Sequence, residues 1–319
     1  MSEQLAIGVD VGGTKIAAGL VDAQGVIVTR VREDIADKSP ASVVAAIAEA
    51  VRKIRSHADA DIHHVGVGLP AFLDTPRDIA VVVPNLGWRD VPARALLSDA
   101  LGCDVALEND ANVAAWGEYR FGAGRGVNDL VAVTVGTGVG GGIIIGGRLF
   151  VGAQGMAAEI GHMTLVPGGL PCPCGKTGCW EQYASGNALV RIGRELASVV
   201  SADATALKDL GDGTVTGITG THITAAAASG NELALRAFAD LADNIAAGLA
   251  DLVAILDPGA FVIGGGVSEA GDLLMKPLQE AYERRVLVDL QRAIPLKVAV
   301  LRNDAGLIGA ADLARFNRD

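Results

Sequence analysis

The stretch that decides the fold is Val9-Asp-Val-Gly-Gly-Thr-Lys15, close to the start of the chain. An alternating apolar strand ends here, and the chain turns at once into a second strand-like run at residues 16–21. Two consecutive glycines let a backbone turn tightly and approach a ligand, so that N–H groups and a threonine hydroxyl can face phosphate oxygens. The turn lacks the length and the following helix of a Walker A loop. It therefore predicts either a phosphate-binding hairpin or a glycine-rich hairpin with an exposed lysine.

Two further glycine turns follow strand-like runs later in the chain. One is Gly136-Thr-Gly-Val-Gly-Gly-Gly142 and the other is Gly264-Gly-Gly266. Each alone is compatible with an ordinary loop, but three such turns, two of them with threonine, favour a shared phosphate-binding role. Asp10 is placed to hold Mg²⁺ through water, and Lys15 adds positive charge. The candidate nucleotide-binding residues are Asp10, Gly12, Gly13, Thr14, Lys15, Thr137, Gly138, Gly264, Gly265 and Gly266.

The sequence around the first turn recurs at residues 129–152, which indicates an internal duplication. VDVGGTK can be laid over VTVGTGV so that Asp10 corresponds to Thr134. Similarity of this kind predicts two copies of one nucleotide-cradling unit. The hydrophobic pattern elsewhere predicts strands and helices in alternation. The expected strands are 5–12, 16–21, 26–32, 64–71 and 260–263, and the expected helices are 40–57, 231–256 and 307–316.

Composition and charge narrow the function classes. The 319 residues suffice for two lobes with separate cores, since single cores rarely grow beyond about 250–300 residues. A formal charge of −11 argues against nucleic acid, whose phosphates need a basic face. No basic leader is visible before the first strand, and no apolar run reaches the roughly 18 residues of a membrane span. We therefore expect a cytoplasmic protein with neither a membrane nor a nucleic-acid partner.

Three of the four cysteines crowd into Cys172-Pro-Cys174-Gly-Lys-Thr-Gly-Cys179. Cysteines two apart would close a strained disulfide ring, so this spacing favours a metal site. Three thiolates and a neutral imidazole form a closed tetrahedral zinc site, which is structural rather than catalytic. His162 is the nearest upstream histidine. Cys103 lies far from the cluster and is expected to be a small buried hydrophobic residue.

Three longer segments resemble the signature segments of the ROK family of sugar kinases and repressors. They are Leu107-Glu-Asn-Asp-Ala-Asn112, Ala158-Glu-Ile-Gly-His162 and Cys172–Glu181, and they follow the turn at Asp10 in the family's order. CWEQYASGN, which begins at Cys179, is similar to the bacterial glucokinases of that family in particular. The resemblance extends over nearly the whole chain.

The resemblance implies an α/β fold of the actin-like ATPase or ribonuclease H-like type, with two lobes and a cleft between them. It implies a small lobe of residues 1–109, completed by a C-terminal helix at about 304–319. The large lobe would comprise residues 110–303 and hold the zinc segment.

The resemblance also implies which residues act on a sugar. Phosphoryl transfer to a hydroxyl needs a base near that hydroxyl, and the family's base corresponds to Asp110. Capping of a helix that begins near Ala111 is a compatible alternative role for this aspartate. Asn85, which follows Pro84, is either a sugar contact or a turn residue. The implied sugar-binding residues are Asn85, Asn109, Asp110, Glu159, His162 and Glu181, and the implied zinc ligands are His162, Cys172, Cys174 and Cys179.

The activity that the resemblance implies is transfer of the γ-phosphate of ATP to the C6 hydroxyl of glucose. The implied cofactors are ATP, Mg²⁺ and a structural Zn²⁺, and the implied assembly is a homodimer or homotetramer. Kinases for mannose, fructose or N-acetylmannosamine share these motifs, so the sugar stays open, as does polyphosphate as the donor. A non-catalytic ROK sugar sensor would carry a DNA-binding domain ahead of this body, and we do not expect one before the turn at Asp10.

Overall fold

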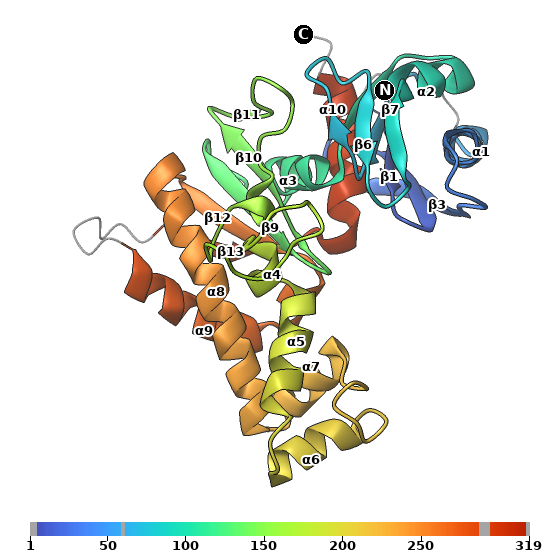
Figure 1. The fold of residues 1–319 in the computed structure, drawn as a ribbon. Helices are drawn as coiled ribbons and strands as arrows, with labels where there is room; N and C mark the ends of the chain where they lie inside the picture. The colour runs from blue at the N-terminus through green and yellow to red at the C-terminus, as the bar shows by residue number, and fades with distance from the viewer. Residues whose placement is uncertain (1–4, 59–60, 287–293, 317–319) are drawn as a thin grey trace. The chain divides into compact units, whose positions relative to one another are not determined.

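A computed structural model describes residues 5–58, 61–286 and 294–316, which form an α/β protein (Figure 1). Internal contacts divide the chain into two compact units. Unit 1 comprises residues 1–132, 141–158 and 299–319, and unit 2 comprises residues 133–140 and 159–298. The lobes expected from the sequence, residues 1–109 with about 304–319 and residues 110–303, are drawn at other boundaries and remain a prediction. Within the described ranges, no helix has both the length and the apolar character that crossing a membrane requires.

Unit 1 is built on a five-stranded sheet with the order β3-β2-β1-β4-β8. The β1–β2 and β2–β3 pairs are antiparallel, whereas β4 pairs in parallel with both β1 and β8. Strands β1 and β4 are almost wholly buried, as expected where both faces of a sheet are covered. The strands are β1 (Ala6–Val11), β2 (Lys15–Val21), β3 (Ile27–Asp34), β4 (Val65–Leu69) and β8 (Val105–Asn109).

A small antiparallel sheet and four helices also belong to unit 1. The small sheet has the order β5-β6-β7, and its strands are β5 (Phe72–Leu73), β6 (Ala80–Val83) and β7 (Trp88–Val91). The helices are α1 (Pro40–Ser56), α2 (Ala93–Leu101), α3 (Asp110–Phe121) and α10 (Ala305–Phe316), and a 3₁₀ turn, η5 (Arg302–Asp304), precedes α10.

The second five-stranded sheet repeats the order of the first, since β11-β10-β9-β12-β13 matches β3-β2-β1-β4-β8. The duplication expected from the sequence is therefore confirmed. Asp10 and Thr134 are each the fifth of six residues in their strand, and the two strands share one burial pattern. The strands are β9 (Leu130–Val135), β10 (Val139–Ile145), β11 (Arg148–Leu149), β12 (Ala260–Gly264) and β13 (Leu296–Val298).

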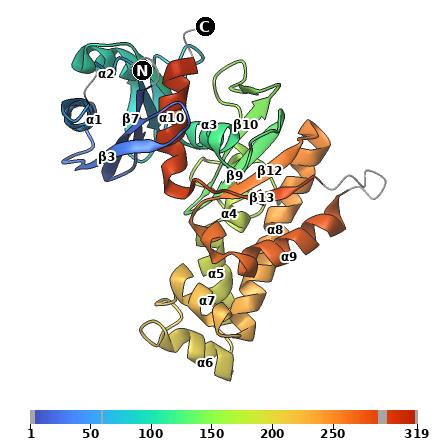
Figure 2. The same ribbon diagram turned by 180° about the vertical axis from the view of Figure 1, so that it is seen from behind.

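Helix α10 lies against β1, β4 and α3, and both ribbon views show it beside α3 (Figures 1 and 2). Glycines make this approach close. A Cβ at Gly8 would overlap the carbonyl oxygen of Leu307, and one at Gly66 would overlap that of Ala310. A segment from the end of the chain thus completes the core that begins at its start. The predicted C-terminal helix is confirmed over the described residues, and positions 317–319 of the prediction lie outside them.

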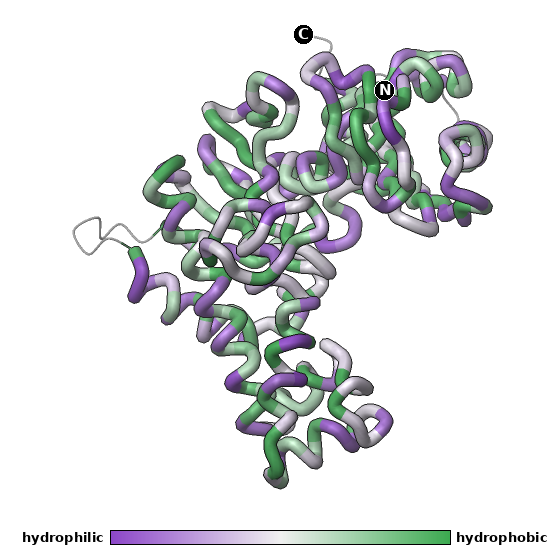
Figure 3. The backbone as a smooth tube through the Cα atoms, in the orientation of Figure 1, coloured by the Kyte–Doolittle hydropathy of each residue, from purple (hydrophilic) through white to green (hydrophobic). Residues whose placement is uncertain are grey.

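The larger helices of unit 2 pack around α8, a helix of 25 residues whose buried positions recur along one face. Apolar and polar residues alternate along its course, as Figure 3 shows. Asn231 caps its first turn by accepting a hydrogen bond from the N–H of Ala234, which places the start one residue after the predicted 231. The helices of unit 2 are α4 (Glu181–Ala184), α5 (Gly186–Leu196), α6 (Ala202–Asp209), α7 (Gly220–Ala228), α8 (Glu232–Leu256) and α9 (Asp272–Arg285), with 3₁₀ turns η2 (Ile160–His162) and η3 (Gly266–Ala270).

Candidate active site

The first glycine turn joins β1 to β2 as a tight hairpin. The N–H of Gly12 donates to the carbonyl of Lys15 at 2.8 Å, and a Cβ at Gly12 would stand only 3.0 Å from the same oxygen. Gly13 differs, because its φ is not positive and a Cβ there would meet nothing within 4 Å. Neither backbone strain nor crowding therefore requires glycine at 13. Open space beside a bare backbone is what a phosphate group would fill.

The two turns in unit 2 contain glycines of the same kind. Gly136 and Gly266 have no positive φ, and a Cβ at either would meet nothing within 4 Å. Gly265 is instead required by the fold, since its φ is 84° and a Cβ would lie 2.5 Å from the carbonyl oxygen of Val135. Gly264 is a buried residue of β12. The residue that sequence reasoning omitted is Gly136, although it belongs to the quoted glycine run.

The second turn is tied to one of the expected sugar-binding residues. The Glu181 carboxylate accepts a hydrogen bond from the N–H of Val139 at 3.0 Å, and a Cβ at Gly138 would overlap it. Gly136 donates to the carbonyl of Gly138 at 2.9 Å, which closes the turn around Thr137. Within unit 2, a candidate phosphate turn and a candidate sugar ligand are therefore in direct contact.

Two carboxylates of unit 1, those of Asp10 and Asp110, have raised pKa values. Burial, followed by the negative charge of Asp110, raises the pKa of Asp10 to about 6. Burial also raises the pKa of Asp110, although the N–H of Ala111 opposes the shift by donating to its carboxylate at 2.9 Å. Gly306, in the first turn of α10, leaves room for Asp10, because a Cβ there would lie 3.1 Å from the carboxylate. Two nearby carboxylates that resist ionisation together form a natural place for a divalent cation or a transferable proton.

The junction of β8 and α3 fixes the backbone on which Asp110 sits. The helix begins at Asp110 and its N-cap is Asn109, so the capping role suggested for the aspartate belongs to its neighbour. Asn109 Oδ1 accepts from the N–H groups of Ala111 and Asn112 at 2.9 and 3.1 Å, and its Nδ2 donates to the carbonyl of Ala71 at 3.1 Å. Asparagine satisfies this position because a short side-chain acceptor can reach the second and third N–H groups of a helix. The Asn109 side chain also hydrogen-bonds the Asp110 carboxylate, which opposes the rise in the pKa of that group.

The four predicted zinc ligands come together in unit 2. One ligand atom from each of His162, Cys172, Cys174 and Cys179 lies within 4.8 Å of all the others. The His162 Nδ1 to Cys172 Sγ distance is 3.7 Å, and the Cys174 and Cys179 sulfurs are 3.6 Å apart. Ligands of a tetrahedral zinc at about 2.3 Å stand about 3.8 Å from one another, so the group matches zinc in donor type, number and spacing.

The zinc segment has little regular structure and is shaped by backbone hydrogen bonds. Cys172 donates to the carbonyl of Lys176 at 2.8 Å, and Lys176 Nζ donates to the carbonyl of His162 at 2.8 Å. Trp180, wholly buried, follows Cys179 and anchors the end of the segment by donating from Nε1 to the carbonyl of Asn244 at 2.8 Å. The loop is thus fastened to the helical core of unit 2 immediately before Glu181.

Glu159 and His162 stand at the two ends of one short turn. His162 ends the short 3₁₀ turn η2, and Glu159 is the residue that caps its start. The His162 N–H donates to the carbonyl of Glu159 at 3.0 Å, so the two side chains leave a single tight turn. Local geometry therefore keeps the two candidate sugar ligands close to the zinc ligands.

The structure shows the surroundings of two further residues, Asn85 and Cys103. Asn85 lies exposed in the four-residue turn between β6 and β7, which is the simpler of its two suggested roles. Cys103 is only partly buried, and its sulfur stands 3.2 Å from Nη2 of Arg55, so it is a polar contact as well as an apolar one. The guanidinium of Arg55 reaches this sulfur because the same side chain caps the carbonyl of Leu101.

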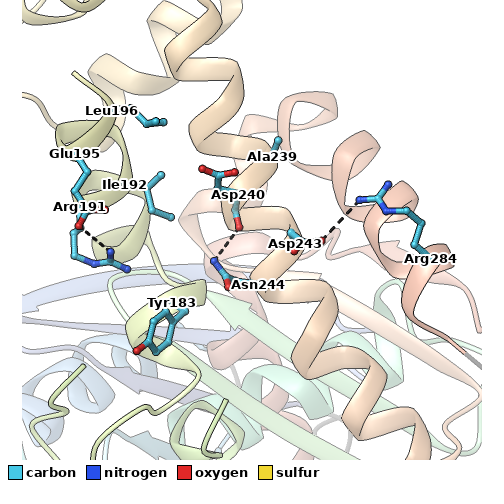
Figure 4. A pocket seen from close by; sticks show the side chains of 10 residues that line it. All are labelled: Tyr183, Arg191, Ile192, Glu195, Leu196, Ala239, Asp240, Asp243, Asn244 and Arg284. Carbon is cyan, nitrogen blue, oxygen red and sulfur yellow. Dashed lines mark hydrogen bonds and ion pairs between the residues drawn. The ribbon is translucent and has the colours of Figure 1, made fainter. Parts of the chain in front are cut away.

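A groove of about 520 Å³ lies in unit 2 and is lined by residues of α4, α5, α8 and α9 (Figure 4). Its polar wall includes Asp240 and Asp243 of α8 and Arg191 of α5. None of the predicted site residues lines it.

The predicted residues instead form two groups, one in each unit. Unit 1 holds Asp10, Gly12, Gly13, Thr14, Lys15, Asn85, Asn109 and Asp110, and unit 2 holds Thr137, Gly138, Glu159, His162, Cys172, Cys174, Cys179, Glu181, Gly264, Gly265 and Gly266.

Comparison with known proteins identifies close relatives. The family model of the ROK family matches residues 6–316. A glucokinase of Streptomyces coelicolor is 46% identical over 313 residues, which cover 98% of both chains. The crystal structure of a ROK family glucokinase from Streptomyces griseus, in complex with glucose and AMPPNP, is 46% identical, with a TM-score of 0.86 and coverage of 98% of this chain and 99% of that one. A ROK hexokinase from Thermus thermophilus is 36% identical, with a TM-score of 0.83 and 98% coverage of both chains.

Proposed function

This chain belongs to the ROK family, and we propose that it is an ATP-dependent glucokinase. It has the family's actin-like ATPase fold of two lobes. The reaction transfers the γ-phosphate of ATP to the C6 hydroxyl of glucose and forms glucose 6-phosphate. The observation that carries the proposal is the full-length likeness, at 46% identity, to glucokinases. The polar groups gathered in the two units supply the chemistry that this reaction needs.

Asp110 is the general base. Its place at the first residue of α3 holds the carboxylate at a fixed point of the backbone, and burial raises its pKa toward the working pH. A base is most effective when its pKa lies near the pH of the reaction. Asp110 accepts the proton of the C6 hydroxyl as the oxygen attacks the γ-phosphate. The bond between the γ-phosphorus and the bridging oxygen of the β-phosphate breaks, ADP leaves, and the proton resides on the Asp110 carboxylate at the end of the step.

Asp10 and the three glycine turns bind Mg²⁺ and the nucleotide. The carboxylate of Asp10 attracts the cation, which would offset the repulsion from Asp110 that raises its pKa. Bare backbone at Gly13, Gly136 and Gly266 leaves space for phosphate oxygens. The cation, when bound, neutralises charge on the transferring phosphate.

His162, Cys172, Cys174 and Cys179 hold a structural zinc, whose chemistry is to cross-link a loop that has few helices or strands of its own. His162 presents Nδ1 to the cysteine cluster, which leaves Nε2 for a sugar hydroxyl. Glu181 follows the last zinc ligand by two residues and is held by the N–H of Val139. These contacts orient Glu181, Glu159 and His162 as acceptors and donors for glucose hydroxyls, together with Asn109 and Asn85.

The experiment that tests the function is an ADP-release assay with Mg·ATP and a panel of sugars. The panel contains glucose, mannose, fructose, N-acetylglucosamine and N-acetylmannosamine, with one reaction in which polyphosphate replaces ATP. We expect kcat/KM for glucose to exceed that for every other sugar. A preference for another hexose would keep the kinase and replace the substrate, whereas no turnover with any sugar would contradict the proposal as a whole.

Two further properties are proposed from membership of the family. We infer a cytoplasmic enzyme that assembles as a homodimer or homotetramer. Sedimentation velocity at several concentrations measures the assembly, and a sedimentation coefficient of a single chain throughout would contradict it.

A further inference from the structure

Arg77 has an unusual backbone conformation for its type. It lies between β5 and β6 with φ at 62°, in the left-handed region that favours glycine. An arginine kept in a sparsely populated region costs free energy, which surrounding contacts must offset. Its side chain is only 12% exposed, so the guanidinium runs into the protein rather than into solvent.

The guanidinium of Arg77 joins three segments of unit 1. Its Nε donates to Glu108 Oε2 at 2.9 Å, and its Nη1 donates to the carbonyls of Asp74 and Gly155 at 3.0 and 3.1 Å. A Cβ on Gly155 would stand 2.5 Å from that same Nη1, so the loop that contains this glycine is shaped to accept the arginine. The β5–β6 turn, strand β8 and the loop near Gly155 therefore meet at one buried cation.

Glu108 connects Arg77 to the start of α3. The carboxylate is 10% exposed, and its second oxygen, Oε1, accepts from the N–H of Asn109 at 2.8 Å and from Asn112 Nδ2 at 3.0 Å. Asn109 is the N-cap of α3, and Asp110 is the first residue of the helix. The carboxylate thus binds the backbone of Asn109, one residue before the proposed base, and the side chain of Asn112, two residues after it.

A buried ion pair is a weak source of net stability, because desolvation of both charges offsets most of their attraction. An apolar pair of similar volume would serve stability as well, but it could not accept two hydrogen bonds at the β8–α3 junction. The directed contacts of Glu108, together with the strained backbone of Arg77, point to a requirement for geometry rather than for stability.

We propose that Arg77 and Glu108 are positioning residues of the phosphoryl transfer, which fix Asn109 and Asp110 against the sugar. The inference rests on the proposed sugar kinase activity and extends it to residues that do not touch substrate. A shift of about 1 Å at a reacting group lowers turnover by about 10²-fold, so loss of this anchorage has a measurable kinetic consequence.

The test uses the full chain with three variants, Arg77→Lys, Glu108→Gln and Arg94→Lys. Lysine keeps the charge of Arg77 but loses the fork that reaches three acceptors at once. Arg94 is the matched control, because it forms ion pairs with Asp104 and Asp78 in the same unit on a more exposed surface. Steady-state kinetics measure kcat and the KM for glucose and for ATP, and thermal unfolding measures folding of each variant.

We expect Arg77→Lys and Glu108→Gln each to lower kcat about 10–100-fold and to raise the KM for glucose about 3–10-fold, because both the base and Asn109 shift. The KM for ATP should stay within about twofold, and Arg94→Lys should match the wild type. Reduced folding alone would scale kcat without changing the KM for glucose. That pattern, or wild-type kinetics with only a lower melting temperature, would overturn the positioning role.

A variant that does not fold is replaced by Asn112→Ser, which removes one donor to Glu108 and leaves the ion pair intact. We expect a smaller kcat loss, about 3–10-fold, with the same change in the KM for glucose and an unchanged KM for ATP. Unchanged kinetics in Asn112→Ser would overturn the proposal. A wild-type protein with no activity on any sugar would instead overturn the proposed function, and the positioning role with it, before any variant is compared.

Discussion

The start of α3 and the zinc segment are built in opposite ways. The α3 junction is made of regular elements, since a parallel strand ends at Asn109 and a helix begins at Asp110. Residues 159–180 contain one short 3₁₀ turn, and their candidate metal ligands are separated by stretches without helices or strands. The first region derives its geometry from regular elements and their hydrogen bonds, whereas the second has few regular elements and would be cross-linked by the proposed zinc.

This difference teaches which perturbation each region should resist. Groups at the α3 junction are held by several neighbours. The loss of one functional atom there should therefore lower catalytic activity and leave the stability of the fold unchanged. Groups in the zinc segment depend on a shared cross-link, so the loss of one ligand should disturb all of them together. Mutations in the first region are expected to affect activity without affecting stability, whereas mutations in the second are expected to affect both.

The largest expected effect is that of Asp110→Asn, which should lower kcat about 10²–10⁴-fold because the amide cannot accept the hydroxyl proton. Glucose binding and the melting temperature should stay close to those of the wild type, since Asn109 keeps the helix cap. Kinetics and calorimetric titration with glucose measure both. Near-normal turnover would remove Asp110 from the mechanism.

Removal of the proposed zinc should have the next largest effect and should not separate binding from folding. After chelation, or in Cys174→Ser, we expect glucose binding to weaken about 10–100-fold and thermal unfolding to begin at a lower temperature. Zinc added back should restore the chelated protein. Cys103→Ser is the control, because Cys103 lies outside the ligand cluster. A fully active protein without bound metal would contradict the role of the cluster.

Gly13→Ala should act on the nucleotide alone. We expect the KM for ATP to rise about tenfold, because the added methyl group fills the space proposed for a phosphate, while the melting temperature stays unchanged. Gly220→Ala is the matched control, since a Cβ there lies 3.8 Å from the side chain of Val190 and the φ is not positive. An unchanged KM for ATP in Gly13→Ala would show that the hairpin does not contact the nucleotide.

The smallest expected effect is a gain in stability from Asp10→Asn. The folded pKa of about 6 lies above the ordinary 3.8, so the folded protein binds the proton more tightly and loses stability as the pH rises through this interval. Asparagine removes this loss, and the variant should gain at most about 3 kcal/mol at pH 7.5 and little at pH 4. Urea unfolding without Mg²⁺ or nucleotide measures it, with exposed Asp99→Asn as the control. Equal gains at both pH values would contradict the electrostatic explanation.

Much of the architecture could be predicted from the sequence because its signals are local. The strand-turn-strand pattern around Asp10 and its recurrence at Thr134 predicted the duplication that the two sheets confirm. The candidate metal ligands could be recognised for the same reason, since three of them lie within eight consecutive residues and the fourth is the nearest upstream histidine. Local spacing is read directly from a sequence, whatever the rest of the chain does.

Several features of the site depended on contacts between distant residues, and only the tertiary structure decided them. It showed that Asn109 rather than Asp110 caps α3, and that Gly306 makes room for Asp10 almost three hundred residues earlier in the chain. It also showed the contact between Arg77 and Glu108, which depends on a left-handed backbone conformation at Arg77 that the sequence does not predict. The sequence by itself determined the glycine turns and the spacing of the candidate metal ligands, because each is written in neighbouring residues, and its resemblance to the ROK family implied the fold. The tertiary structure decided the pKa of Asp10 and the anchorage of α3, because burial and long-range hydrogen bonds exist only once the chain has folded.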